Sequence, residues 1–141
     1  AGQLGLGDYL QVLTGTDPGA PCDRAVIEAA FGRMAAFEEP LIVRLLDYLN
    51  GRSDVRVIGP REPGPDRVGT ISFVHDTKSS REIAEAVDHT NVAIRHGHMY
   101  AWHLCDALGL PEDDGVVRVS FVHYNTLAEI EALIAILDRT L

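Results

Sequence analysis

The 141-residue sequence predicts an α+β domain, in which helices cover a mostly antiparallel sheet of about four strands. Three observations lead to this expectation. Apolar residues recur at helical spacing early in the chain, residues 116–122 alternate between apolar and polar, and two capping boxes precede later apolar segments. The order of elements is helix, two strands, helix, strand, short helix, strand and helix.

The first half of the chain should contain a long helix followed by a hairpin. Apolar residues spaced by three, four and seven predict one amphipathic helix, or two, over residues 24–50. Pro40 should kink this helix or begin a second one, because it lacks an amide hydrogen and clashes with the preceding turn. Residues 55–58 and 68–74 are apolar runs separated by a Pro- and Gly-rich turn, so we expect them to pair as a hairpin.

A capping box predicts the next helix. Ser79 and Glu82 stand three residues apart, so that each side chain can bond to the other's backbone amide, and the helix should extend to about residue 87. A third strand is expected at residues 92–95, and a short helix over residues 99–108.

The C-terminal part of the sequence gives the clearest pattern. Residues 116–122 have the period of two that is typical of a strand with one buried face. Thr126 and Glu129 form a second capping box, and the apolar residues that follow predict a closing helix.

Composition excludes several function classes. The chain has 12 basic and 21 acidic residues, a formal charge of -9, so we expect no nucleic-acid partner. No apolar run approaches the roughly 18 residues of a membrane span, so no membrane association is expected. The two cysteines, Cys22 and Cys105, lie far apart and match no disulfide or metal pattern, which favours a reduced, cytoplasmic setting.

Three histidines, His96, His98 and His103, lie within eight residues and raise the question of a metal site. Neither an HExxH motif nor a cysteine pair accompanies them. We therefore expect no metal, and interpret these side chains as loop histidines that bond to the backbone.

Two arginines form a better candidate site. Arg95 and Arg118 each occupy a polar position at or near the end of an apolar strand. Together they could bind a carboxylate with bidentate geometry, although two structural ion pairs with the abundant acidic residues would explain them equally well.

Two segments resemble a known family. The sequences are VAIRHGHMYAWHL, residues 92–104, and VVRVSFVHYNTLAEIEALIAIL, residues 116–137. Together they resemble the C-terminal domain of class V aminotransferases, in the branch of the cysteine desulfurases and selenocysteine lyases. The likeness extends upstream through DVRVIGP and RVGTISFVHD and covers residues 31–141.

The resemblance implies the small C-terminal domain of a fold type I enzyme that uses pyridoxal 5'-phosphate and acts as a homodimer. Residues 1–30 would then connect to a large cofactor-binding domain of the same chain, upstream of residues 31–141. That domain holds the lysine that forms the Schiff base with the cofactor. Lys78, the only lysine here, does not match it, so the 141-residue chain alone should bind no cofactor and be inactive.

The resemblance also assigns roles at the candidate site. Arg118 matches the arginine that binds the substrate's α-carboxylate, and Arg95 the arginine before the catalytic loop, with His98 shaping the mouth of the site. Tyr100 stands where desulfurases carry the cysteine that accepts sulfur. A phenol cannot store sulfur, and Cys105 falls within an apolar helical stretch, so this chain has no evident catalytic residue of its own.

The sequence therefore predicts part of a cysteine desulfurase-like enzyme acting on a small amino acid, by desulfuration, lysis or transamination. The alternative is a self-standing α+β module that binds a partner or an anion without catalysis. A metal-binding histidine module is a third, more distant hypothesis.

Overall fold

The computed structural model describes residues 2–17, 19–64 and 67–141. The elements are α1 (Gly2–Thr14), α2 (Arg24–Asn50), β1 (Val55–Ile58), β2 (Thr70–His75), α3 (Ser80–Asp88), β3 (Arg95–Gly97), α4 (Trp102–Ala107), β4 (Val116–Ser120) and α5 (Leu127–Thr140). The four strands form one antiparallel sheet in the order β1-β2-β4-β3, so the predicted α+β fold class is confirmed.

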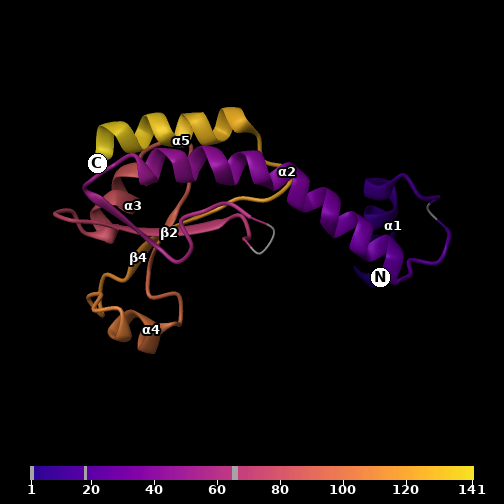
Figure 1. Cartoon of the computed structure of the whole chain (residues 1–141), viewed down its shortest axis with the longest axis horizontal. Coiled ribbons are helices and arrows are strands. Elements are labelled where there is room, and N and C mark those ends of the chain that lie inside the picture. Colours follow the sequence, from indigo (N-terminus) through magenta and orange to yellow (C-terminus); the bar gives the residue numbers. More distant parts are fainter. Residues whose placement is uncertain (1, 18, 65–66) are drawn as a thin grey trace.

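One face of the sheet carries the hydrophobic core. Val57, Phe73 and Val117 lie opposite one another across β1, β2 and β4, and all three side chains are buried. The second half of α2 lies over this face together with α3 and α5 (Figure 1). Burial of these branched and aromatic side chains is the main source of stability, at about 1.5–3 kcal/mol for each large apolar residue.

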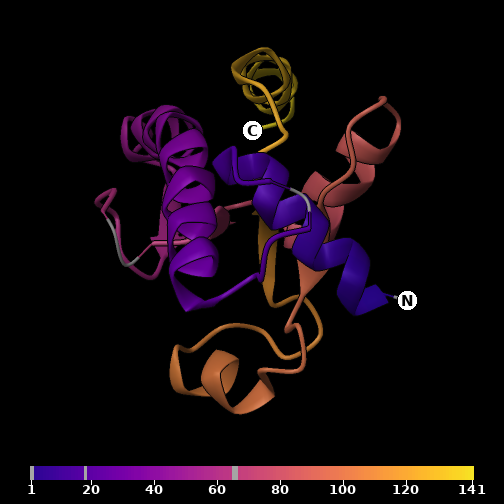
Figure 2. The same ribbon diagram turned by 90° about the vertical axis from the view of Figure 1, so that its right-hand side faces the viewer.

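The opposite face of the sheet is only partly covered. The segment that contains α4 lies there, on the side away from α5 (Figure 2). Cys105, Leu110 and Val116 form a small apolar cluster at one end, packed against Ile58 and Val74. The rest of this face is left to polar side chains.

Helix α2 is continuous through Pro40, and its axis changes direction about midway (Figure 1). The bend agrees with the missing amide hydrogen and the steric demand of proline. Beyond Pro40 the helix buries Leu41, Leu45 and Leu49, whereas the first half extends past the sheet and contacts α1. The kinked-helix prediction is therefore correct.

Two local expectations were wrong, and one helix was not foreseen. No element was predicted at the glycine-rich start of the chain, but α1 forms there and buries Leu10, so tertiary packing outweighs the low helix propensity of glycine. The third strand lies at Arg95–Gly97 rather than at residues 92–95, because β4 pairs with it only there. The helix expected over residues 99–108 is confined to Trp102–Ala107, because Met99 and Tyr100 have left-handed backbone angles. No helix among the described residues is both long and apolar enough to span a bilayer.

Both predicted capping boxes are present. Ser79 Oγ accepts from the amide of Glu82 at 3.1 Å, and Glu82 Oε2 accepts from the amide of Ser79 at 2.8 Å. Thr126 and Glu129 repeat this arrangement at the start of α5. In each case the hydrogen bond from the backbone amide of the cap residue to the carboxylate is the main reason why the pKa of the glutamate is lowered.

These caps predict an acid dependence of stability. Since the folded-state pKa values are depressed, the two carboxylates stabilise the fold above the ordinary glutamate pKa of 4.5, and this contribution is lost as pH falls through the lower folded values. We expect the double variant Glu82→Gln/Glu129→Gln to be less stable at neutral pH and to lose less stability on acidification. Urea unfolding over a pH series measures both, with Glu85→Gln in the middle of α3 as the control. Parallel pH profiles for the double variant and the unaltered protein would contradict the expectation.

Candidate functional site

The two arginines singled out in the sequence lie side by side on neighbouring strands. Arg95 in β3 and Arg118 in β4 are direct partners in the antiparallel register. Residues directly opposite each other in such a pair project from the same face of the sheet. Because Val117 and Val119 point into the core, this face is the open one that carries α4. The structure therefore brings the two predicted site residues together.

The environment of Arg118 suits an anion. Its side chain is partly buried, and its Nε atom is buried without a hydrogen-bond partner among the described residues. Its other neighbour in the register is Ser72 of β2, which offers a hydroxyl. Such a buried donor without a partner costs free energy until an acceptor arrives.

No carboxylate of the described residues lies within ion-pair distance of Arg95 or Arg118. Among the described residues only Arg24, Arg44 and Arg52 have such a partner: Arg44 binds Glu131 through two contacts of 2.6 and 2.9 Å, and Arg52 binds Asp54 at 2.7 Å. This argues against the interpretation of Arg95 and Arg118 as two structural ion pairs. Together the two guanidinium groups form a site that can receive a carboxylate.

The loop after β3 has an unusual backbone. Met99 and Tyr100 have φ angles of 51° and 63°, a region that side chains other than glycine seldom adopt. His98 supports this conformation, because its Nδ1 atom accepts from the amide of Tyr100 at 3.2 Å. Tyr100 is fully exposed to solvent. The loop thus presents the phenol outward rather than packing it.

Two glycines fix where this loop begins. Gly97 ends β3 with φ 120°, and Gly115 precedes β4 with φ 63°. A Cβ atom on Gly115 would lie 2.2 Å from the carbonyl carbon of Gly97 and 2.5 Å from the amide nitrogen of His98. Only glycine permits so close an approach of the two backbones. The sequence analysis missed this contact. A glycine directly before the strand predicted at residues 116–122 was the feature that could have indicated it.

The three histidines do not converge. His96 is paired with Val117 and so projects from the helix-covered face, opposite to Arg95. The ring of His103 lies against Trp102, with centroids 5.1 Å apart. No group of three or more histidine, cysteine, aspartate or glutamate side chains in the described part of the chain could hold a metal ion.

The two cysteines and the lysine differ in where they lie. Cys105 is on the same face of the sheet as the arginines, but it is buried there in the cluster with Leu110 and Val116. Cys22 is exposed in the connection between α1 and α2. Lys78 bonds through Nζ to the carbonyl of Thr140, at the end of α5 on the helix-covered side.

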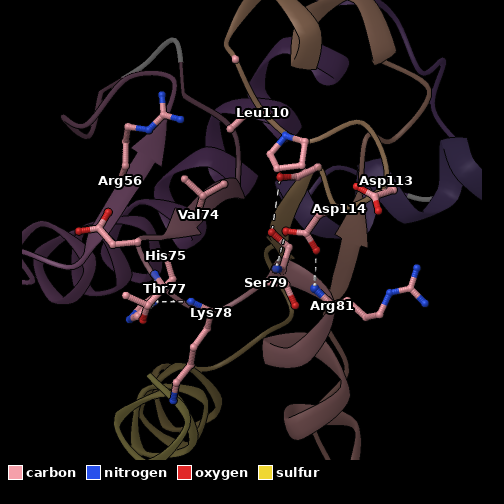
Figure 3. A pocket seen from close by; sticks show the side chains of 15 residues that line it. Arg56, Val74, His75, Thr77, Lys78, Ser79, Arg81, Leu110, Asp113 and Asp114 are labelled. Atoms are coloured by element: carbon pink, nitrogen blue, oxygen red, sulfur yellow. Dashed lines mark hydrogen bonds between the residues drawn. The ribbon is translucent and has the colours of Figure 1, made fainter.

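A separate cleft of about 610 Å³ lies beside the start of α3 (Figure 3). Its basic residues suggest an anion site, but the carboxylate of Asp114 already accepts from the amides of Ser80 and Arg81 at 2.7 and 3.0 Å. Figure 3 shows Asp114 close to Arg81, and Lys78 directed toward α5. Asp114 therefore already occupies the position at which an anion would meet these two amides.

Comparison with known proteins gives a consistent result. Residues 24–133 match the family model described as aminotransferase class-V. The chain is 39% identical over 112 residues to an aminotransferase-like protein of Gibberella zeae, covering 77% of this chain and 27% of that protein. It is 38% identical over 104 residues to a probable cysteine desulfurase of Halobacterium salinarum, covering 74% and 24%. The chain thus spans about a quarter of the length of these curated relatives.

The fold is similar to that of solved cysteine desulfurases. The apo structure of the enzyme from Thermococcus onnurineus superposes with a TM-score of 0.70 at 28% identity, over 82% of this chain and 28% of that one. The cysteine desulfurase CsdA of Escherichia coli gives a TM-score of 0.63 over 89% of this chain and 32% of that one, at 22% identity, and supports the fold alone.

The glycine contact predicts a difference between two otherwise similar substitutions. Gly109 has φ 66° and open space around it, so Gly109→Ala should cost about 1–2 kcal/mol through backbone strain alone. Gly115→Ala adds a clash with Gly97 and should cost a further ~1–3 kcal/mol. Urea denaturation of both variants compares the two costs. Equal destabilisation would show that the close approach does not constrain β3 and β4.

Proposed function

The chain belongs to the aminotransferase class-V family, and on this premise we propose that it is the C-terminal small domain of a cysteine desulfurase-like enzyme that uses pyridoxal 5'-phosphate. The α+β fold fits a domain of a fold type I enzyme of this kind. The substrate is a small amino acid. The observation that carries the proposal is the buried Nε of Arg118, which has no hydrogen-bond partner among the described residues and lies directly beside Arg95 on the open face of the sheet.

Arg118 binds the α-carboxylate of the substrate. It lies on β4, which has a hydrogen-bonded neighbour on each side, so its backbone is held in place before the substrate arrives. A guanidinium fixed in this way can donate two parallel hydrogen bonds to a carboxylate and thereby orient the amino acid. Ser72, its partner on β2, adds a hydroxyl on the same face.

The described residues do not by themselves fit pyridoxal phosphate. The only lysine of the chain, Lys78, bonds to α5 on the other side of the sheet, and the positive region at the start of α3 is occupied by Asp114. When bound, this cofactor serves as the electron sink for reactions at the α-carbon. The Schiff-base lysine and the phosphate site would therefore lie in the large domain, outside these 141 residues.

The loop carries no sulfur acceptor. Tyr100 stands at the place of the family's cysteine, and its exposed phenol cannot hold sulfane sulfur. Cys105 is nearby in sequence but buried. His98 and Tyr100 line the mouth of the site, where His98 keeps the loop in its left-handed conformation. The chemistry of this enzyme accordingly does not pass through a persulfide on this loop.

We also propose two partners, a large domain and a second copy of the protein. A large cofactor-binding domain of the same chain covers the first half of α2, where Phe31 and Phe37 are 61% and 56% exposed. The chain's share of about a quarter of its relatives' length leaves room for such a domain. The homodimer and the cytoplasmic location are proposed on the family resemblance, and the two free cysteines are compatible with a reducing compartment. The family match does not favour the alternative of a self-standing binding module.

The experiment uses the longer protein that contains this chain, loaded with pyridoxal phosphate. The absorption spectrum of the cofactor is followed while L-alanine or L-cysteine is added, and sulfide release is assayed in parallel. For Arg118→Gln we expect the concentration of amino acid at half-maximal change to rise by about 10- to 100-fold, since hydrogen bonds to a charged group are lost. Arg24→Gln, on the exposed start of α2, is the matched control and should change nothing.

Two results would contradict the proposal. If the cofactor spectrum of the unaltered protein does not respond to any small amino acid, the chain does not serve an enzyme of this type. If it responds equally in Arg118→Gln, Arg118 is not the carboxylate site.

A further inference from the structure

Three polar side chains from distant parts of the chain meet away from the two arginines. The hydroxyl of Tyr9 in α1 bonds to Nε2 of His123, which lies in the connection between β4 and α5. On the other side of the same ring, Nδ1 lies 4.0 Å from the carboxylate of Glu38 in α2. We infer that His123 is a positioning residue, which holds α1 in a fixed place relative to the strand that carries Arg118.

This inference rests in part on the proposed function. Residues 1–30 are proposed to connect to the large cofactor-binding domain, so α1 lies on the side of the chain that leads to the cofactor. Strand β4 carries Arg118, the proposed site of the α-carboxylate. A contact between α1 and the end of β4 therefore sets how a bound amino acid is placed relative to the cofactor, and reaction rates depend strongly on such orientation.

The contacts of His123 use both ring nitrogens. With the phenol of Tyr9 as donor to Nε2, a neutral ring carries its hydrogen on Nδ1, toward the carboxylate of Glu38. The side chains of His123 and Glu38 are only 13% and 18% exposed. Polar groups removed from water in this way depend on partners within the protein, so solvent does not fully replace a contact that is lost.

The bond between Tyr9 and His123 joins two parts of the fold. Helix α1 packs on α2, where Arg33 donates from Nη1 to the carbonyl of Leu13 at 2.7 Å. Among the described residues, the bond to His123 is the only hydrogen bond that connects α1 with the chain beyond α2. Figure 1 shows the connection from β4 to α5 passing close to the middle of α2, which agrees with the contact to Glu38.

The connection after β4 is itself fixed to the sheet. The amide of Phe121 donates to the carbonyl of Gly69 at 2.8 Å, which extends the pairing of β2 with β4. The next amide, that of Val122, donates to Oδ1 of Asn125 at 2.9 Å. His123 follows directly, so a contact to its ring holds the end of β4 rather than a free loop.

Hydrogen exchange in the 141-residue chain tests whether His123 holds α1. Tyr9→Phe removes the hydroxyl and keeps the ring, so the backbone amides of α1 should exchange about fivefold faster, the effect of losing one hydrogen bond. Tyr124→Phe is the matched control, because Tyr124 also packs on the ring of His123 but its exposed hydroxyl bonds to none of the described residues. The amides of α3 are the internal reference and should not change in either variant.

A double variant separates a specific contact from a general loss of packing. Tyr9→Phe and His123→Gln remove the same bond, so the two together should raise the exchange of α1 no further than His123→Gln alone. Glu38→Gln should act in the same direction with a smaller effect, because its carboxylate lies 4.0 Å from the ring. Unchanged exchange of α1 in Tyr9→Phe, or additive effects of the two changes, would overturn the inference and leave the proposed function intact.

The longer protein, loaded with pyridoxal phosphate, tests the positioning role. At saturating amino acid, the rate of the cofactor's spectral change should fall about fivefold in Tyr9→Phe, whereas the half-maximal concentration should stay within about twofold, because Arg118 is unaltered. Arg118→Gln should instead raise the half-maximal concentration. An unchanged rate in Tyr9→Phe would overturn the positioning role and leave Arg118 as the carboxylate site. If the unaltered protein responds to no small amino acid, the proposed function fails and the positioning role fails with it.

Discussion

The pairing of β3 with β4 is the interaction on which the candidate site depends. Three residues of β3 pair with β4, and this short register decides that Arg95 faces Arg118 rather than the core. A slip by one residue would turn Arg95 to the helix-covered face and bring His96 to the open one. The contact between Gly97 and Gly115 at the end of the pair fixes the register, because a side chain on Gly115 would force the strands apart.

The sheet separates stability from function by its two faces. The helix-covered face is continuous and apolar, and the ion pair between Arg44 and Glu131 joins the two long helices above it. The open face combines two arginines that pair with no carboxylate in the described part of the chain with a loop in a strained backbone conformation, features that lower stability locally. The helix-covered face compensates for this local loss of stability, because its hydrophobic core includes side chains from both the sheet and the helices. An arrangement of this kind is common where a rigid scaffold carries a binding site.

Structural features that neighbouring residues determine could be predicted from the sequence, whereas features that distant residues determine could not. Both capping boxes and the bend at Pro40 follow from neighbouring residues, and they were predicted correctly. The two arginines were recognised as candidates by their positions at strand ends and by the family resemblance. Their direct opposition could not be foreseen, because strand register is set by residues far apart in the chain. The left-handed loop at Met99 and Tyr100 was missed for a related reason, since these residue types do not favour that backbone and only the surrounding structure imposes it. Helix α1 was missed because its packing on α2, rather than its glycine-rich sequence, stabilises it.

The register of β3 on β4 can be measured directly by interstrand nuclear Overhauser effects in the 141-residue chain. We expect cross-strand contacts between the backbone protons of Arg95 and Arg118, and between those of His96 and Val117. Contacts of Arg118 with Ile94 or His96 in place of Arg95 would place the two arginines on opposite faces. The anion site described here would then not exist.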